Sequence, residues 1–178
     1  FGADIYLRAI EKHRCTRLTG VPTMMAMLLQ QPDLSRTDVS SVRTIAMGSA
    51  PASAKLFQRL KAAFPGAAVV NGYGTTEAGA VTFGPHPRGL PRPEGSLGHP
   101  LTDIDVRLDD GENDDSGVLV LRTPAVAPGY LNLPERTRQV FRDGWYTTGD
   151  VMRRDENGFF YFVRRNDDMI VCGGENVH

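Results

Sequence analysis

The sequence lacks long hydrophobic runs and lacks an excess of charge of one sign. No uninterrupted apolar stretch approaches the roughly 20 residues that span a bilayer, so no membrane span is expected. The 178 residues carry 20 Lys and Arg against 21 Asp and Glu, which leaves a formal net charge of −1. Nucleic-acid-binding proteins carry a marked positive charge, so no nucleic-acid partner is expected. These absences predict a soluble, cytoplasmic protein.

Cysteine is scarce, and its two positions exclude the usual cysteine-based sites. Cys15 and Cys172 lie near opposite ends of the chain and form no CxxC pair, so neither a disulfide framework nor a zinc site is indicated. The chain begins at Phe1 without an initiator Met or a signal-peptide pattern, and it stops at His178 directly after a glycine-rich turn. We therefore expect that both ends are cut and that the chain holds only part of a longer protein's site.

Residues 1–92 alternate helical and strand patterns, which is typical of a layered α/β subdomain. The segment DIYLRAIEKHR predicts a helix with Ile5, Ala9 and the aliphatic part of Lys12 on one face. The segment PTMMAMLLQQ is apolar nearly all round, which predicts a buried helix opened by Pro22. A third helix follows in SAKLFQRLKAAF, with a serine N-cap and large apolar residues at helical spacing.

Two predicted strands of this part end in loops of small residues. The strand from Val42 to Met47 runs into Gly48 and Ser49, and the strand in GAAVVNGYG stops in glycines. Open α/β sheets bind ligands at the carboxyl ends of their strands. These two loops are therefore the expected ligand-binding edge.

After the Pro- and Gly-rich stretch 84–95 the pattern changes to short alternating strands. DIDVRL, GVLVLR and GFFYFV predict a small antiparallel β-rich subdomain over residues 93–163. The acidic segment DDGENDDSG between the first two strands lacks the ligand spacing of a calcium loop, so we interpret it as a solvated hairpin loop. The predicted fold class is therefore α/β, with a layered part followed by a β-rich part.

The most informative segment is NGYGTTEAG, Asn71 to Gly79. Its glycines let the backbone approach a ligand closely, and Thr75 and Thr76 offer hydroxyl and N–H donors to a phosphate. Glu77 supplies the hard oxygen ligand that Mg²⁺ prefers, and Tyr73 supplies a ring for a purine. The combination predicts a nucleotide phosphate site; the alternative is a glycine-rich turn with incidental polar residues.

Two later segments add polar groups of the same kind. DGWYTTGD ends in Asp150, whose carboxylate can accept from both hydroxyls of a ribose. VRRNDDMIVCGGENVH pairs arginines with aspartates, and an arginine fork suits a phosphate or ribose. Taken alone, the first segment would be better interpreted as a turn or cap aspartate, and the second as a solvated charge cluster before an edge strand.

These motifs, in this order, resemble the adenylate-forming (AMP-binding) superfamily, specifically its acyl-CoA and aryl-CoA synthetases. TRLTGVPTMMAMLLQ and IAMGSAP are similar to the region before the family's nucleotide loop, and NGYGTTEAG is similar to that loop. GSLGHPL, GVLVLRTPAVAPGYLNLPERT and GWYTTGD match its β-rich subdomain. The resemblance covers essentially the whole chain and implies that residues 93–163 form a distorted barrel. It also implies that residues 164–178 form the hinge and the first strand of a truncated lid domain.

The resemblance implies a two-step reaction. A carboxylic acid and ATP give an acyl-adenylate and pyrophosphate, and a thiol, usually that of coenzyme A, then displaces AMP. The implied partners are a small-molecule carboxylic acid, ATP and coenzyme A, with Mg²⁺ as the metal, and a homodimer of the parent protein is a compatible assembly. Two alternatives stay open: an adenylation domain that loads a carrier protein, and a non-catalytic nucleotide-binding or interaction module.

The resemblance also assigns site residues. Those implied to contact ATP, AMP or coenzyme A are Gly48, Ser49, Ala50, Asn71, Gly72, Tyr73, Gly74, Thr75, Thr76, Asp150, Arg165, Gly173 and Gly174. Thr76 is implied to contact the α-phosphate and Glu77 the Mg²⁺, while Asp167 is implied to be the hinge of the lid. Those implied to line the acid pocket are Met24, Met25, Ser49, Gly72, Gly79 and Ala80, a set of small and flexible apolar residues that suits an aryl or medium aliphatic acid.

Two departures from the family pattern bear on these assignments. The family's GRxDD is RRNDD here, so Arg164 replaces a glycine, which is expected to restrict the backbone on the hinge side. The chain has no upstream Gly/Ser/Thr-rich phosphate loop, and its only lysines, Lys12, Lys55 and Lys61, all precede the nucleotide loop. The family's adenylation lysine lies near the far C-terminus, so this chain alone is expected to be incomplete for catalysis.

Overall fold

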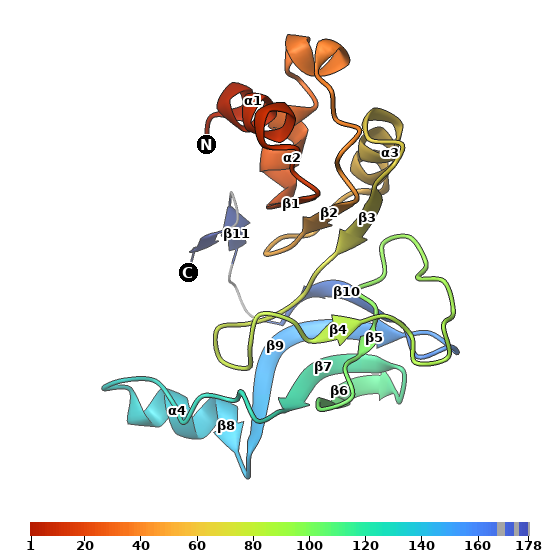
Figure 1. Cartoon of the computed structure of the whole chain (residues 1–178). Coiled ribbons are helices and arrows are strands. Elements are labelled where there is room, and N and C mark those ends of the chain that lie inside the picture. Colours follow the sequence, from red (N-terminus) through yellow and green to blue (C-terminus); the bar gives the residue numbers. More distant parts are fainter. Residues whose placement is uncertain (167–169, 173–174, 178) are drawn as a thin grey trace. The chain divides into compact units, whose positions relative to one another are not determined.

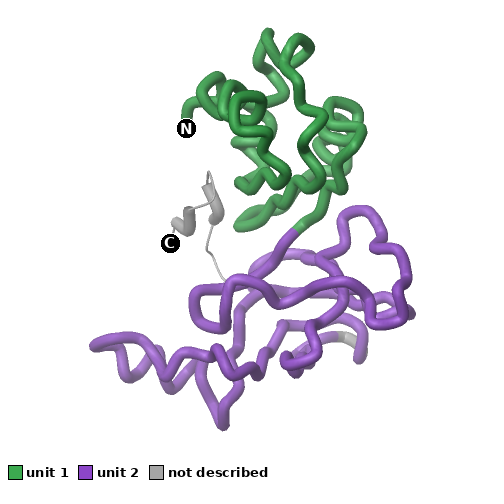
Figure 2. The backbone as a smooth tube through the Cα atoms, viewed as in Figure 1, with its two compact units in different colours: residues 1–71, 170–177 green, residues 72–169, 178 purple. Residues whose placement is uncertain are grey.

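The computed structural model describes residues 1–166, 170–172 and 175–177, which form two compact units. The first unit comprises residues 1–71 with 170–177, and the second comprises residues 72–169 with 178 (Figure 2). No helix in the described part of the chain is both long enough and apolar enough to cross a membrane.

The first unit is built on a parallel three-stranded sheet (Figure 1). Its elements in chain order are α1 (Ala3–His13), β1 (Arg17–Gly20), α2 (Pro22–Leu28), the 3-10 helix η1 (Pro32–Arg36), β2 (Thr44–Met47), α3 (Ala54–Ala63), β3 (Ala68–Asn71), β11 (Ile170–Cys172) and β12 (Glu175–Val177). The sheet order is β1-β2-β3, and Gly20, Met47 and Asn71 lie in register at the carboxyl end. The layered α/β expectation for this part is confirmed.

The third helix follows the sequence pattern closely. Leu56, Phe57, Leu60 and Phe64 are all buried, and the Ser53 hydroxyl accepts a hydrogen bond from the Leu56 N–H at 3.3 Å, as an N-cap does. The apolar face of α3 therefore closes the core of the first unit.

The other two helices differ from expectation in which face they bury. In α1 the buried residues are Ala3, Leu7 and Ile10, whereas Ile5 is 63% exposed, so the expected face was wrong. In α2 the pattern predicted burial all round, but Met27 is 46% exposed. Both corrections have one cause: α1 and α2 pack against each other at the edge of a small unit, so each has one side facing solvent.

The second unit is antiparallel and β-rich. Its elements are β4 (Phe83–Gly84), β5 (His99–Pro100), β6 (Asp105–Asn113), β7 (Ser116–Arg122), α4 (Pro134–Val140), β8 (Phe141–Arg142), β9 (Trp145–Arg154) and β10 (Phe160–Arg165). Strands β6 and β7 form the expected hairpin, but both extend into the acidic segment 109–117, so only residues 114–115 lie between them. The short helix α4 was not predicted, because its seven residues carry no apolar stripe.

The main sheet of the second unit is open. It has five strands in the order β10-β9-β7-β6, with β8 paired to β9, while β4 and β5 form a separate pair. Within the described residues, β6 and β10 are the two edges and do not pair with each other, so the expected distorted barrel is not closed. Register shifts interrupt the pairing of β9 with β10, of β6 with β7 and of β7 with β9.

The segment 72–92 packs with the β-rich unit, although its sequence pattern placed it with the α/β part. The Phe83 ring stacks on Phe160 with centroids 5.0 Å apart, and the Leu101 N–H donates to the Thr82 carbonyl at 3.1 Å. Burial of these aromatic residues ties the segment to β5 and β10. The two-unit division therefore falls between residues 71 and 72.

Candidate functional site

The candidate residues of the first unit lie where its parallel strands end. The Gly48 N–H donates to the Gly20 carbonyl at 3.3 Å, so the loop after β2 starts beside the end of β1. Asn71 lies opposite Met47 in the sheet and is 8% exposed. Ser49 has a φ of 61°, a left-handed conformation that is uncommon for a residue with a Cβ. The two predicted loops thus do leave one edge of the sheet, and Ala50 continues the first of them.

The predicted acid-pocket methionines lie at the same edge. A Cβ on Gly20 would come within 2.7 Å of the Met25 Cε and 3.2 Å of the Met24 Cε, so both methyl ends lie against this glycine's backbone. Met25 is fully buried and belongs to the core, whereas Met24 is half-buried.

The nucleotide loop begins the second unit and is a tight, self-closed turn. The Thr75 N–H donates to the Gly79 carbonyl at 2.9 Å, and the Thr75 hydroxyl accepts from the Ala78 N–H at 3.0 Å. A Cβ on Gly74 would lie 2.2 Å from the carbonyl of Ala80, so only glycine fits there. Gly72, Thr76 and Ala80 are exposed. The loop therefore holds its shape by its own bonds and presents Thr76 to solvent.

Tyr73, Asp150 and Arg165 come together beside this loop. The Tyr73 hydroxyl donates to the Asp150 Oδ2 at 2.5 Å, and the Arg165 Nη1 donates to the Asp150 Oδ1 at 2.9 Å. Asp150 is 5% exposed, and the Thr148 hydroxyl accepts its backbone N–H at 3.0 Å. Burial, and after it the charge of Asp150, raises the pKa of Tyr73 well above its ordinary value. The result is a carboxylate held in one orientation by donors from two segments.

Glu77 is held at both its main chain and its side chain by one distant segment. The Ala127 N–H donates to the Glu77 carbonyl at 2.7 Å, and the Tyr130 hydroxyl donates to the Glu77 Oε1 at 2.7 Å. Burial, followed by the bond to Glu77, raises the pKa of Tyr130 to about 12, so this hydroxyl remains a donor at neutral pH. Burial and the charge of Glu77 also raise the pKa of Tyr146.

The sequence reasoning missed Tyr130, Tyr146 and Thr148 as members of the site. Tyr146 and Thr148 lie in the motif DGWYTTGD, and Tyr130 lies in GVLVLRTPAVAPGYLNLPERT, but neither segment indicated a role for these three side chains. Tyr130 stands 53 positions after Glu77, so only the tertiary fold brings the two together. A buried aromatic hydroxyl that needs a partner was the one available signal.

The donor set around Glu77 fits Mg²⁺ of the kind that binds with a nucleotide. Among the described residues there is no cluster of three or more His, Cys, Asp or Glu side chains that could hold a metal by itself. Mg²⁺ typically binds through one or two carboxylates together with substrate phosphates. A single half-buried carboxylate on a phosphate-type loop fits this arrangement.

The predicted residues near the C-terminal end differ in what the structure says of them. Asp167, Gly173 and Gly174 lie outside the described residues. Arg164 lies in β10 with an exposed side chain, and its Nη1 donates to the Arg165 carbonyl at 3.1 Å. The substitution of the family glycine leaves β10 intact here.

Comparison with known proteins gives the family. The family model described as "AMP-binding enzyme" matches residues 2–131. The chain belongs to the AMP-binding enzyme family. It is 36% identical to a long-chain-fatty-acid–CoA ligase of Bacillus subtilis, over 97% of this chain and 31% of the relative. It is 38% identical to a feruloyl-CoA synthase of an Amycolatopsis species, over 100% of this chain and 37% of the relative.

Solved structures agree with this assignment. The amide bond synthetase McbA from Marinactinospora thermotolerans superposes with a TM-score of 0.86 at 32% identity, over 100% of this chain and 37% of its own. The anthranilate CoA ligase AuaEII, in complex with anthranoyl-AMP, gives a TM-score of 0.82 at 31% identity, over 98% of this chain and 34% of its own. The chain thus spans about a third of the length of the relatives that it matches, and it has the adenylate-forming fold over that length.

Proposed function

We propose that the full-length protein is an ATP-dependent carboxylic acid–CoA ligase that works through an acyl-adenylate. The observation that carries the proposal is the cluster of Tyr73, Asp150 and Arg165 beside a nucleotide loop that also holds Glu77. The likeness to acyl-CoA and aryl-CoA ligases supports the same reaction. The described part of the chain supplies the nucleotide side of the site.

In the first half-reaction, an oxygen of the substrate carboxylate forms a bond to the α-phosphorus of ATP, and the bond from that phosphorus to pyrophosphate breaks. Asp150 accepts hydrogen bonds from the ribose hydroxyls, and Arg165 holds the Asp150 carboxylate in place. The Tyr73 ring lies against the adenine, and the exposed Thr76 donates to the α-phosphate. Glu77 is the residue that would hold Mg²⁺, which when bound would supply charge stabilisation to the phosphates.

In the second half-reaction, the thiol of coenzyme A attacks the acyl carbonyl, its proton passes to solvent or a base, and AMP leaves. We assign Asp167 to the hinge of the lid domain and Gly173 and Gly174 to the coenzyme A side. The acid pocket is assigned to Met24, Ser49, Gly72, Gly79 and Ala80, without Met25, because its side chain is fully buried in the core. These small and flexible apolar side chains favour an aryl or medium aliphatic acid.

The acceptor is the finer part of the proposal. Coenzyme A is favoured because the named relatives include CoA ligases and synthases. The likeness to an amide bond synthetase supports an amine as the second candidate acceptor, since the adenylation step is the same for both. Offering coenzyme A and simple amines to the preformed adenylate separates the two.

The deciding experiment is pyrophosphate–ATP exchange by the full-length protein across a panel of aryl and aliphatic acids. We expect acid-dependent exchange in the unmodified protein and a strong loss with Glu77→Gln, because an amide is a poorer Mg²⁺ ligand than a carboxylate. Glu156→Gln is the matched control, since Glu156 is an exposed carboxylate of the same unit outside the cluster. Exchange that no acid stimulates would overturn the proposal, and an unchanged Mg²⁺ dependence of Glu77→Gln would remove Glu77 from it.

A further inference from the structure

The segment from Ala125 to Thr137 contacts the nucleotide loop at one residue in particular. Two hydrogen bonds reach Glu77 from this segment, one to its carbonyl from Ala127 and one to its Oε1 from Tyr130, both at 2.7 Å. The first bond fixes the backbone of Glu77, and the second fixes the direction of its carboxylate. The segment therefore restrains the two parts of the residue separately.

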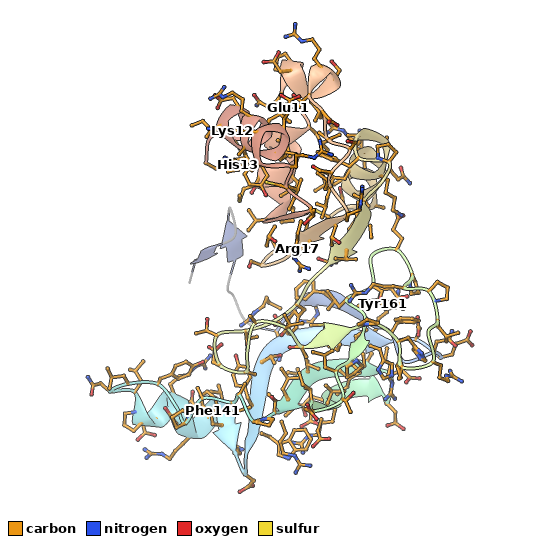
Figure 3. The ribbon with its side chains drawn as sticks, viewed as in Figure 1. Glu11, Lys12, His13, Arg17, Phe141 and Tyr161 are labelled. Carbon is orange, nitrogen blue, oxygen red and sulfur yellow. The ribbon has the colours of Figure 1, made fainter. Side chains whose placement is uncertain are left out.

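The hydroxyl of Tyr130 is itself held in place. Its ring meets Phe141 edge-on with centroids 5.4 Å apart, and Phe141 stacks on Tyr146 at 5.2 Å. Phe141 lies at the junction of α4 and β8 (Figure 3), so this aromatic row is anchored in the sheet through β8 and β9. The Tyr130 ring thus has little freedom to move away from Glu77.

The backbone of Tyr130 is anchored by α4. The Thr137 hydroxyl accepts the Tyr130 N–H at 2.9 Å and donates to the Leu133 carbonyl at 2.9 Å. A Cβ on Gly129 would lie 2.5 Å from the Thr137 Cγ2, so the threonine packs directly on this glycine. Ring, hydroxyl and main chain of Tyr130 are therefore all held by contacts within the chain.

We propose that Tyr130 is a positioning residue that orients the Glu77 carboxylate for the divalent cation of the bound nucleotide. The hydroxyl donates to Oε1 and so restricts rotation of the carboxylate, which leaves the second oxygen, Oε2, in one direction. Cation binding then does not have to restrict that rotation itself. This inference rests on the proposed function, because it takes Glu77 as the cation ligand.

The test compares Tyr130→Phe with the unmodified full-length protein. Phenylalanine keeps the ring contacts and removes only the hydroxyl. Partners that orient a metal ligand typically change metal affinity by about 10- to 100-fold, and a half-buried site belongs at the lower end. We expect the Mg²⁺ concentration for half-maximal pyrophosphate exchange to rise about tenfold by that scale, while the exchange rate at saturating Mg²⁺ and the KM for the acid stay within about twofold.

A binding measurement gives the readout that does not depend on activity. Calorimetry should show an unchanged ATP affinity in EDTA and a reduced gain in affinity when Mg²⁺ is added to Tyr130→Phe. Hydrogen exchange of the Ala127 amide should stay protected, because its bond to Glu77 does not involve the hydroxyl. Loss of that protection would mean that the segment has collapsed, and Tyr130 would then be a structural residue only.

Two further variants make the result specific. Tyr161→Phe is the matched control, since Tyr161 also donates to a carboxylate of this unit, Asp155, at 2.9 Å, and it lies well apart from Phe141 (Figure 3). Its Mg²⁺ requirement should not change. Adding Tyr130→Phe to Glu77→Gln should have no further effect on the Mg²⁺ requirement, because the oriented carboxylate is already gone.

The outcomes separate the two proposals. If exchange occurs but Tyr130→Phe leaves its Mg²⁺ dependence unchanged, the positioning role is wrong and the proposed function stands. If no acid supports exchange, the proposed function fails, and calorimetry with and without Mg²⁺ still decides the role of Tyr130. Thr137→Val, which removes the acceptor of the Tyr130 N–H, should shift the Mg²⁺ requirement in the same direction by a smaller factor; no shift in either variant overturns the inference.

Discussion

Removal of the Asp150 carboxylate should cost both folding stability and nucleotide affinity. Asp150 accepts from Tyr73 and from Arg165, and the side chains of this ion pair are 7% and 20% exposed for Asp150 and Arg165, respectively. Asp150→Ala therefore removes an acceptor that a mostly buried guanidinium and a partly buried phenol share. The two losses arise from different contacts and can be measured apart.

The size of the stability loss follows from burial. Removing one partner of a buried ion pair costs about 3 to 5 kcal/mol, and the partial exposure of Arg165 places this pair at the lower end, about 3 kcal/mol. Asp150→Asn should cost less, because its amide oxygen still accepts one hydrogen bond, and one hydrogen bond typically contributes about 1 kcal/mol to stability. The affinity for ATP should fall by about 1 to 3 kcal/mol, the scale of a hydrogen bond to a charged group.

Urea denaturation of the full-length protein measures the first loss, and calorimetry with ATP and 2′-deoxy-ATP measures the second. Asp155→Ala is the control, because Asp155 accepts the Asn157 and Phe159 N–H groups at 3.0 Å in the turn after β9. This control should lower stability without changing the ATP affinity. A comparable loss of affinity in both variants would show that instability alone weakens binding.

Two results would refute the reasoning. If the free energy of unfolding of Asp150→Ala lay within about 0.5 kcal/mol of that of the unmodified protein, the range of ordinary surface substitutions, the ion pair would not contribute to stability as a buried pair does. If the unmodified protein binds ATP and 2′-deoxy-ATP equally well, Asp150 does not recognise the ribose.

Two further predictions concern backbone strain and pH. Because Ser49 has a φ of 61°, Ser49→Val should lower the unfolding free energy by about 1 to 2 kcal/mol, whereas Ser49→Gly should be at least as stable as the serine protein in urea denaturation. The folded-state pKa of Tyr130, about 12, lies above the ordinary 10.0, so the folded state holds this proton more tightly than the unfolded state does. The contribution of this proton to the free energy of unfolding is therefore complete below about pH 10. That contribution should be lost as the pH rises toward about 12, and unfolding curves of Tyr130→Phe over this range should fall less steeply than those of the unmodified protein.

Local sequence patterns predicted the helices whose apolar residues all lie on one face. In α3 the spacing of Leu56, Phe57 and Leu60 matches the face that is buried, and Ser53 starts the helix where its hydroxyl can cap it. The face of α1 could not be predicted in the same way. Its sequence offers apolar residues on more than one side, and only packing against the neighbouring helix selects Leu7 over Ile5.

The candidate site also has parts that local sequence patterns predict and parts that they do not. The nucleotide loop could be found from sequence, because its glycine at position 74 and the Thr75 turn are local features of a backbone that folds back on itself. The contact between Glu77 and Tyr130 could not, since it joins positions 53 apart. Such contacts depend on where the sheet places the intervening chain.

Sequence alone does not decide which of the adjacent residues Arg164 and Arg165 pairs with Asp150. Up to Phe162, β10 pairs with β9 in one register, and after it the pairing shifts by one residue, so that Arg165 lies opposite Asp150. Without this bulge the earlier register would place Arg164 there. A one-residue slip also moves each side chain to the other face of the sheet.

The bulge therefore decides which arginine becomes part of the site. Cross-strand partners in an antiparallel pair share a face, so Arg165 meets the Asp150 carboxylate at 2.9 Å while Arg164 stays exposed. Val163, between the two registers, is 50% exposed and lies outside the core. Arg164 is thus accommodated by facing solvent, and the ion pair of Arg165 with Asp150 depends on the irregular register rather than on either arginine's place in the sequence.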